Sequence, residues 1–267
     1  MTPRLNNGRR VEGSVAVVTG ANGGLGSAIA LALGLEGAKV ALGVRHGHDV
    51  AETVLDEIKK AGGDGHVGPL DVTNNESIKD FVGRSCNLYG PADILINAAG
   101  RIDPADTVRF DKIDADDWDK IFEIDVKGTM LMCQAVVIQM RERGRGSIIN
   151  FSGSYGNGVN KDNMVNSVCI PFCAAKGAVR AFTASLARDL APTIRVNAIS
   201  PGPIEANWEA DWGISKEHMD EALAMTLLGR LGKPEEIAET AMYLASDGSG
   251  YMTGQNLLVD AGWTLVG

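Results

Sequence analysis

The segment from residue 168 to 190, VCIPFCAAKGAVRAFTASLARDL, contains a lysine that could take part in a reaction. Lys176 lies one helical turn after Phe172, so both side chains are expected on the same face of one helix. A lysine ammonium can hold or deliver a proton, whereas a phenyl ring has none to give. Any reaction at this position therefore needs a proton source other than residue 172.

A glycine-rich loop, VVTGANGGLGSAIA, begins at residue 17 and is the second chemical signal. It follows a short apolar run and opens a segment with helical periodicity. Glycines at such a turn let the backbone approach a pyrophosphate, and the N-terminus of the helix favours an anion. Glycines also serve any tight turn, but a strand before and a helix after the loop favour a dinucleotide site. Its expected members are Gly20, Asn22, Gly23, Gly24, Leu25 and Gly26.

The end of the next apolar run, KVALGVRHGHD, indicates which nicotinamide cofactor is preferred. A carboxylate there would hold the ribose hydroxyls of NAD, whereas an arginine suits the 2′-phosphate of NADP. Val44 stands at the acidic position and is followed by Arg45 and His46, so NADP(H) is expected over NAD(H). Arg45 could instead be a solvated surface charge. Asp71 and Val72 are expected at the adenine edge, although Asp71 could also be a simple turn residue.

These residues need a scaffold, and alternating strand and helix patterns predict one. Continuous apolar runs predict strands at 14–20, 38–44, 65–72, 92–100, 146–152, 194–200 and 255–262. Buried strands separated by helices are typical of a parallel sheet covered on both faces. Right-handed crossovers then give an α/β, three-layer, doubly wound Rossmann fold of about seven strands. Residues 1–12 are expected to form a flexible tail and 13–267 a single domain.

Composition excludes several classes of function. The net charge of −9 and the pI near 5.0 argue against a nucleic-acid partner. No apolar run reaches the roughly 18–20 residues needed to cross a bilayer, and the polar start is not a secretory signal. Four cysteines without a CxxC pair fit a cytoplasmic setting, with no metal site expected.

Together the motifs resemble the short-chain dehydrogenases/reductases, in their single-domain branch. They are TGANGGLG (19–26), NAAG (97–100), AAKGAV (174–179) and IRVNAISPGPI (194–204), with a fitting tail over 227–262. The resemblance covers about residues 12–264. It implies a bound nicotinamide cofactor, a small-molecule substrate, a substrate lid at about 203–228, and a homo-oligomer, either a tetramer or a dimer, paired through the C-terminal helix and last strand. It adds these cofactor-binding candidates: Asn97, Ala98, Ala99, Gly100, Lys176, Pro201, Gly202 and Ile204.

Family members arrange an asparagine, a serine, a tyrosine and a lysine around the nicotinamide, and this chain matches only the lysine, Lys176. Asp125, Gly153 and Phe172 stand at the asparagine, serine and tyrosine positions. Phe172 cannot supply a proton and Gly153 cannot hydrogen-bond a substrate oxygen, so the pocket wall becomes apolar and roomier. Asp125 brings a carboxylate close to Lys176, and such a pair can hold a water and deliver its proton. Asp125 could instead be a helix-interior carboxylate neutralised by a neighbour.

The peroxisomal 2,4-dienoyl-CoA reductases look similar, with aspartate for this asparagine, no tyrosine and the lysine kept. The resemblance implies an NADP(H)-dependent oxidoreductase that protonates through Asp125, Lys176 and a water, on a bulky or conjugated C=C–C=O substrate. Residues 205–221 carry six acidic side chains, and a lid of that sign would repel CoA phosphates. Two other functions stay open: a non-redox cyclase, lyase or isomerase, and an inactive nucleotide-binding or sensing protein.

The residues expected around the substrate follow the fifth and sixth predicted strands. Tyr155 could substitute for the lost acid, or it could be a loop tyrosine in water. Trp208 and Trp212 offer flat apolar surface for a ring-bearing substrate, or they could pack against the lid's own helix. The full set of candidates is Gly153, Ser154, Tyr155, Phe172, Pro203, Trp208 and Trp212.

Overall fold

Seven strands form one parallel sheet in the order β3-β2-β1-β4-β5-β6-β7, which confirms the predicted fold. The computed structural model describes residues 9–101, 110–154, 170–206 and 216–265. The strands are β1 Val15–Thr19, β2 Lys39–Val44, β3 Asp64–Pro69, β4 Ile94–Asn97, β5 Gly146–Phe151, β6 Ile194–Pro201 and β7 Asn256–Val259.

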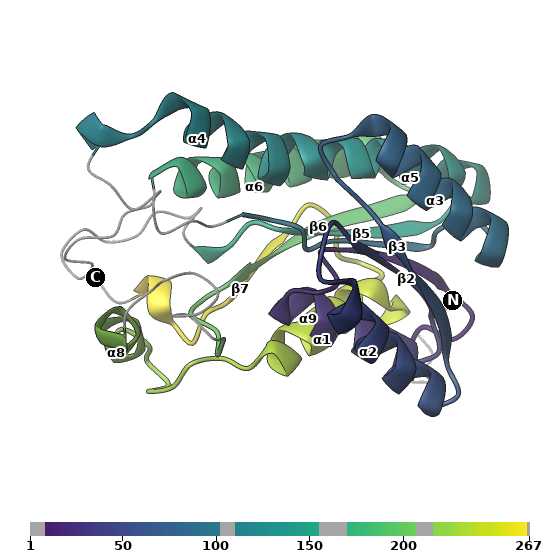
Figure 1. Cartoon of the computed structure of the whole chain (residues 1–267), viewed down its shortest axis with the longest axis horizontal. Helices are drawn as coiled ribbons and strands as arrows, with labels where there is room; N and C mark the ends of the chain where they lie inside the picture. Colours follow the sequence, from purple (N-terminus) through teal and green to yellow (C-terminus); the bar gives the residue numbers. More distant parts are fainter. Residues whose placement is uncertain (1–8, 102–109, 155–169, 207–215, 266–267) are drawn as a thin grey trace.

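Helices cover both faces of the sheet (Figure 1). One face carries α1 Gly24–Leu35, α2 His48–Lys60 and α9 Pro234–Ala245, and the other carries α3 Asn75–Tyr89, α5 Thr129–Arg143 and α6 Ile170–Leu190. Successive residues of a strand point to opposite faces of the sheet and pack in different cores. Ala16 and Val18 of β1 pack on the first face, and Val17 packs on the second. This burial on both faces explains why the strands read as continuous apolar runs.

The carboxyl ends of the central strands meet at one edge of the sheet. Thr19 of β1 is in register with Asn97 of β4, and Asn97 is in register with Asn150 of β5. The chain order reverses between β1 and β4, since their neighbours are β2 on one side and β5 on the other. Open α/β sheets bind ligands in the crevice at such a switch point. The loops after β1, β4, β5 and β6 all emerge at this edge.

Two further helical segments belong to the second layer. A short helix, α4 Ala115–Ile121, runs into a π-helical segment, Phe122–Gly128, which runs into α5. Helix α8 Lys216–Ala224 lies apart from the layers, near the C-terminal 3₁₀ turn (Figure 1). Among the described residues, no helix combines the length and the apolar character that crossing a membrane requires.

Residues 9–12 are the described part of the predicted N-terminal tail, and Arg10 and Val11 contact the rest of the domain. Val11 is buried, and its N–H donates to the Glu36 carbonyl oxygen (3.3 Å). The Arg10 guanidinium forms ion pairs with Glu36 (2.9 Å) and Glu239 (2.7 Å). Residues 10 and 11 therefore join the start of the chain to the end of α1 and to α9.

His66 of β3 makes stability depend on pH. The ring is 7% exposed, packs against Phe81 and Tyr89, and has no hydrogen-bond partner for either nitrogen among the described residues. Burial first, and then the charge of Arg84, lower the pKa of His66 from 6.5 to about 4, against a smaller opposite effect of Asp64. Between these values the unfolded chain takes up a proton that the folded chain does not. Stability is therefore unaffected above pH 6.5 and falls as the pH drops towards 4.

At pH 4 the wild type should have lost about 3 kcal/mol of unfolding free energy, relative to pH 7, through His66. We expect the His66→Leu variant not to show this loss. Urea titrations at pH 7 and pH 4 measure it. His46→Leu, at an exposed histidine, is the matched control and should leave the pH dependence unchanged. An equal decline with pH in His66→Leu and the wild type would contradict the assignment.

Candidate functional site

The glycine-rich loop after β1 has no room for side chains at two positions. Gly20 has a φ of +63°, and a Cβ there would lie 2.9 Å from the Ala99 backbone. A Cβ on Gly26 would overlap the Gly20 carbonyl oxygen. The Ala99 N–H donates to Thr19 Oγ1 (2.9 Å), which ties this loop to the NAAG segment after β4. The structure thus brings the two predicted cofactor-binding loops together.

The N-terminus of α1 is left open for a ligand. Its N-cap, Gly23, makes no side-chain cap, and the first turn has no acidic residue. By contrast, Asn74 caps α3 by accepting from two backbone N–H groups. Gly23 and Gly24 are exposed, and an added Cβ on Gly24 would meet nothing within 4 Å. Accessible glycines at an uncapped helix N-terminus suit a pyrophosphate, so the residues present fit a dinucleotide.

The end of β2 lies beside this loop. Val44 is buried, whereas Arg45 and His46 are exposed. Gly47 then takes a left-handed conformation, and a Cβ on it would come within 2.8 Å of Asn22 Nδ2. Arg45 and His46 therefore lie next to the glycine loop, where the adenosine half of a dinucleotide would extend.

Asp71 has a structural task of its own. Its Oδ1 accepts from the Thr73 N–H (2.9 Å) and from Thr73 Oγ1 (2.7 Å), so it stabilises a turn, and its place at the adenine edge stays a prediction. Burial would raise the pKa of Asp71, but the bonds from Thr73 and the charge of Arg45 lower it overall. Arg45 therefore lies near enough to influence Asp71. Val72 packs against Gly128, at the end of the π-helical segment.

The buried centre of the site is an ion pair between Asp125 and Lys176. Asp125 is 1% exposed and Lys176 is 7% exposed, and Oδ1 lies 2.6 Å from Nζ. Asp125 Oδ2 accepts from the Arg101 N–H (2.9 Å), and Lys176 Nζ donates to the Phe151 carbonyl oxygen (3.2 Å). Both oxygens of the carboxylate are engaged by the protein. The neighbour that would neutralise a helix-interior carboxylate is Lys176 itself.

The two missing hydroxyls leave apolar surface beside this pair. Lys176 Nζ lies 5.2 Å from the centroid of the Phe172 ring, within the range of a cation–π contact. Gly153 has a φ of +67°, and a Cβ on it would lie 3.8 Å from Lys176 Cγ. The backbone therefore favours glycine at residue 153, although the space would admit a side chain.

The side chains of the neighbouring serines, Ser152 and Ser154, form hydrogen bonds within the protein. Ser152 Oγ is buried and shares short hydrogen bonds with Ser200 Oγ (2.7 Å) and Asn256 Oδ1 (2.6 Å). Ser154 Oγ, also buried, donates to the Pro201 carbonyl oxygen (2.5 Å). These bonds join the loop after β5 to the end of β6, where Pro201 and Gly202 are expected beside the nicotinamide.

The segment after β6 is fixed at its start. The Gly202 N–H donates to the Val259 carbonyl oxygen (3.0 Å), and a Cβ on Gly202 would lie 2.6 Å from Asp260 Cα. Pro203 is buried and Ile204 forms a bridge with Gly232. Three predicted substrate residues lie outside the described part of the chain: Tyr155, Trp208 and Trp212.

Two backbone groups and one element at the site could not be predicted from residue types. The groups are the Arg101 N–H and the Phe151 carbonyl, which position Asp125 and Lys176. The element is the π-helical segment that carries Asp125. Single π turns occur often at functional sites.

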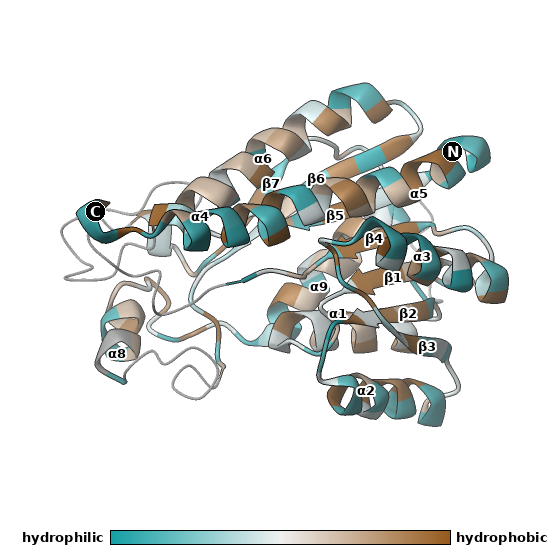
Figure 2. Ribbon diagram, turned by 45° about the horizontal axis from the view of Figure 1, so that its top comes forward, coloured by the Kyte–Doolittle hydropathy of each residue, from teal (hydrophilic) through white to brown (hydrophobic). Residues whose placement is uncertain are grey.

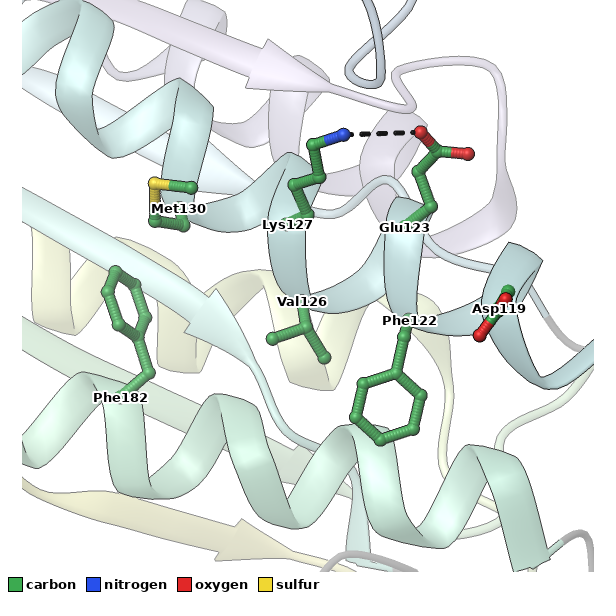
Figure 3. Close-up of a pocket in the computed structure, with 7 residues that line it drawn as sticks. All are labelled: Asp119, Phe122, Glu123, Val126, Lys127, Met130 and Phe182. Atoms are coloured by element: carbon green, nitrogen blue, oxygen red, sulfur yellow. Dashed lines mark hydrogen bonds and ion pairs between the residues drawn. The ribbon is translucent and has the colours of Figure 1, made fainter.

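A hollow of about 620 Å³ lies elsewhere, on the outer surface of the second helical layer (Figure 3). Phe182 of α6 points toward the helix that carries Val126 and Met130, and Lys127 pairs with Glu123 (3.3 Å). The lining residues are Asp119, Phe122, Glu123, Val126, Lys127, Met130 and Phe182. None of them is a predicted site residue, although Phe122 and Val126 pack in one apolar cluster with Phe172.

Similar proteins share this architecture over the whole chain. A family model described as enoyl-(acyl carrier protein) reductase matches residues 20–264. A 3-oxoacyl-[acyl-carrier-protein] reductase, FabG of Thermotoga maritima, is 38% identical over 261 residues, covering 95% of this chain and 98% of the relative. The 2,5-dichloro-2,5-cyclohexadiene-1,4-diol dehydrogenase LinX of Sphingobium indicum is 33% identical, covering 96% and 98%.

A solved structure gives the same result. The crystal structure of gox2181 superposes with a TM-score of 0.88 at 32% identity, covering 96% of this chain and 97% of that one. With the glycine loop at the switch point of the sheet and the lysine beside it, these matches fix the family. The chain belongs to the short-chain dehydrogenases/reductases and is an NAD(P)-dependent oxidoreductase of that family.

Proposed function

We propose that this protein is an NADP(H)-dependent reductase of a bulky, conjugated C=C–C=O substrate. The observation that carries the proposal is the buried Asp125–Lys176 pair, which faces a phenyl ring and a glycine instead of two hydroxyls. Reduction of a simple carbonyl places charge on an alkoxide that needs a positioned acid. Reduction of a conjugated C=C places the charge on an enolate oxygen, which a nearby ammonium can stabilise.

The roles of the two charged residues follow from their burial. Asp125 is enclosed by the protein and holds Lys176 as its counter-ion. Lys176 provides the positive charge for the enolate oxygen, and a water held by its ammonium supplies the proton to the α-carbon. When bound, the reduced nicotinamide supplies the hydride to the β-carbon. One hydride and one proton then account for saturation of the double bond.

The names of similar proteins support an unsaturated or cyclic substrate without selecting one. The matching family model is described for enoyl reduction, and LinX is named for a cyclohexadienediol. FabG is named for reduction of a 3-oxoacyl group, which is a carbonyl. The apolar surface at Phe172 and Gly153 favours the conjugated class for this chain.

The test follows NADPH absorbance with purified protein against simple ketones and against cyclic enones and enoyl thioesters, with product analysis in parallel. We expect oxidation with the conjugated set only, at one NADPH for each double bond saturated. Product formed without NADPH oxidation would favour a non-redox cyclase, lyase or isomerase. Tight NADPH binding with no product in either set would favour a sensing role.

Restoring the missing hydroxyls should move activity toward ketones. We expect Phe172→Tyr with Gly153→Ser to raise ketone reduction by about 10²-fold over the wild type, since a positioned acid contributes about 10²–10⁴ in rate. Gly153→Ser alone should mainly cost stability, about 1–2 kcal/mol, because φ is +67°. Rates with one ketone and one enone measure the shift. No gain on ketones would show that the missing hydroxyls do not limit this reaction.

We also propose that the chain forms a homo-oligomer through α9 and β7. Three large side chains are exposed here: Tyr243 of α9, Tyr251 in the turn before β7, and Leu258 of β7. β7 is also an edge strand of the sheet. Light scattering should give a dimeric or tetrameric mass, and Leu258→Lys should lower it. A monomeric wild type would contradict this assembly.

A further inference from the structure

The π-helical segment that presents Asp125 has an unusual hydrogen-bond pattern at its end. In an α-helix the N–H of residue 129 would donate to the carbonyl of residue 125. Here the Thr129 N–H donates to the Val126 carbonyl oxygen instead. The Asp125 carbonyl accepts from the Thr129 hydroxyl, at 2.7 Å. The hydroxyl of Thr129 thus gives the Asp125 carbonyl a donor that the Thr129 N–H, which is bonded to Val126, does not provide.

Burial makes this replacement matter. Thr129 is 6% exposed and Asp125 is 1% exposed, so a carbonyl that lost its donor would lose a hydrogen bond away from water. The preceding residue, Gly128, packs closely against the loop between β3 and α3, since a Cβ on Gly128 would lie 2.7 Å from Val72 Cγ2. The end of the π segment is therefore fixed on one side by close packing and on the other by a hydroxyl.

The carboxylate of Asp125 depends on the backbone held in this way. Oδ1 pairs with Lys176 (2.6 Å) and Oδ2 accepts from the Arg101 N–H (2.9 Å), and both partners come from other elements. A small displacement of residue 125 would lengthen both contacts at once. Displacements of about 1 Å in a catalytic group can cost about 10²-fold in rate.

We propose that Thr129 is a positioning residue for the Asp125–Lys176 pair, acting through the Asp125 carbonyl. The proposal rests on the proposed function for its kinetic consequence, whereas its geometric consequence does not. Loss of the hydroxyl should let the π segment relax toward an ordinary helical turn and draw Asp125 away from Lys176. Cofactor binding, which uses other loops, should remain.

The kinetic test uses Thr129→Val, which exchanges the hydroxyl for a methyl, and Thr129→Ser, which keeps it. We expect kcat with an enone to fall about 10- to 100-fold in Thr129→Val, with little change in KM for NADPH and near wild-type turnover in Thr129→Ser. Thr240→Val is the matched control, because Thr240 makes the same kind of bond to the Glu236 carbonyl on α9. On an Asp125→Asn background, Thr129→Val should cost nothing more. An equal loss on both backgrounds would overturn the proposal.

A second measurement is independent of turnover. In ¹⁵N-lysine-labelled protein, a buried, ion-paired ammonium exchanges its protons slowly enough to give a signal, and Lys176→Met assigns it. We expect this signal in the wild type, Thr129→Ser and Thr240→Val, and its loss in Asp125→Asn and Thr129→Val. If the wild type shows no turnover, the proposed function is refuted. The lysine ammonium signal then still tests the role of Thr129, because it does not depend on turnover. Retention of both signal and wild-type kcat in Thr129→Val would overturn that role.

Discussion

We expect replacement of Lys176 by methionine to lower the rate of the proposed NADPH-dependent enone reduction by about 10²–10⁴, the contribution of a positioned proton donor. In the proposed reaction, the ammonium would both stabilise the developing enolate and hold the water that protonates it. Asp125→Asn should lose most of the same effect, because the contact at 2.6 Å is charge-assisted. Stopped-flow single-turnover rates at saturating NADPH measure the chemical step directly.

A second lysine variant, Lys127→Met, is the control for Lys176→Met. Lys127 pairs with Glu123 on the exposed side of the same π segment, so Lys127→Met should keep near wild-type turnover. Lys176→Met also leaves a buried carboxylate without its partner, which costs about 3–5 kcal/mol. The double variant Lys176→Met with Asp125→Asn removes both charges and should recover stability without recovering turnover. Wild-type turnover in that double variant would refute the role of the pair.

We expect replacement of Arg45 by glutamine to raise KM for NADPH by about 10- to 100-fold, the contribution of one charge-assisted hydrogen bond to a phosphate. KM for NADH should change by less than about threefold, because NADH lacks the 2′-phosphate. The exposed position of Arg45 at the end of β2, beside the glycine loop, is the basis for this expectation. Steady-state kinetics with both nucleotides provide the measurement.

Arg141→Gln is a suitable comparison, since Arg141 is exposed and pairs with Asp189 on α6. Its loss should leave both KM values unchanged. The NADPH effect of Arg45→Gln should also shrink at high salt, because exposed charges are screened. An equal rise of KM for NADH and NADPH in Arg45→Gln would show that Arg45 does not recognise the 2′-phosphate.

Periodicity and glycine spacing predicted the fold because burial on both faces of the sheet leaves a direct trace in the sequence. All seven strands appear near their expected positions. The observed β3 and β4 end at Pro69 and Asn97, before the predicted ends at 72 and 100. The apolar pattern continues past these strands into residues that pack as loops at the edge of the sheet, such as Val72 and Ala99.

The proximity of Asp125 and Lys176 was also predicted, since both residues align with positions that the family places around the nicotinamide. What the sequence could not predict is carried by backbone geometry. The π-helical segment at Phe122–Gly128 has no residue signature, and the donors and acceptors at Arg101 and Phe151 are main-chain groups that any residue possesses. The left-handed φ at Gly153 likewise explains why residue 153 is a glycine. From the sequence alone, this residue was only the replacement of a serine.

In the proposed reaction, hydride goes to a conjugated carbon while Lys176 and its water supply the proton. The most direct measurement uses NADPH deuterated at the transferable position, a cyclic enone, and mass and NMR analysis of the product. We predict deuterium at the β-carbon, a solvent-derived proton at the α-carbon and an intact carbonyl. Deuterium on a carbinol carbon, with the double bond retained, would show a carbonyl reductase and contradict the account.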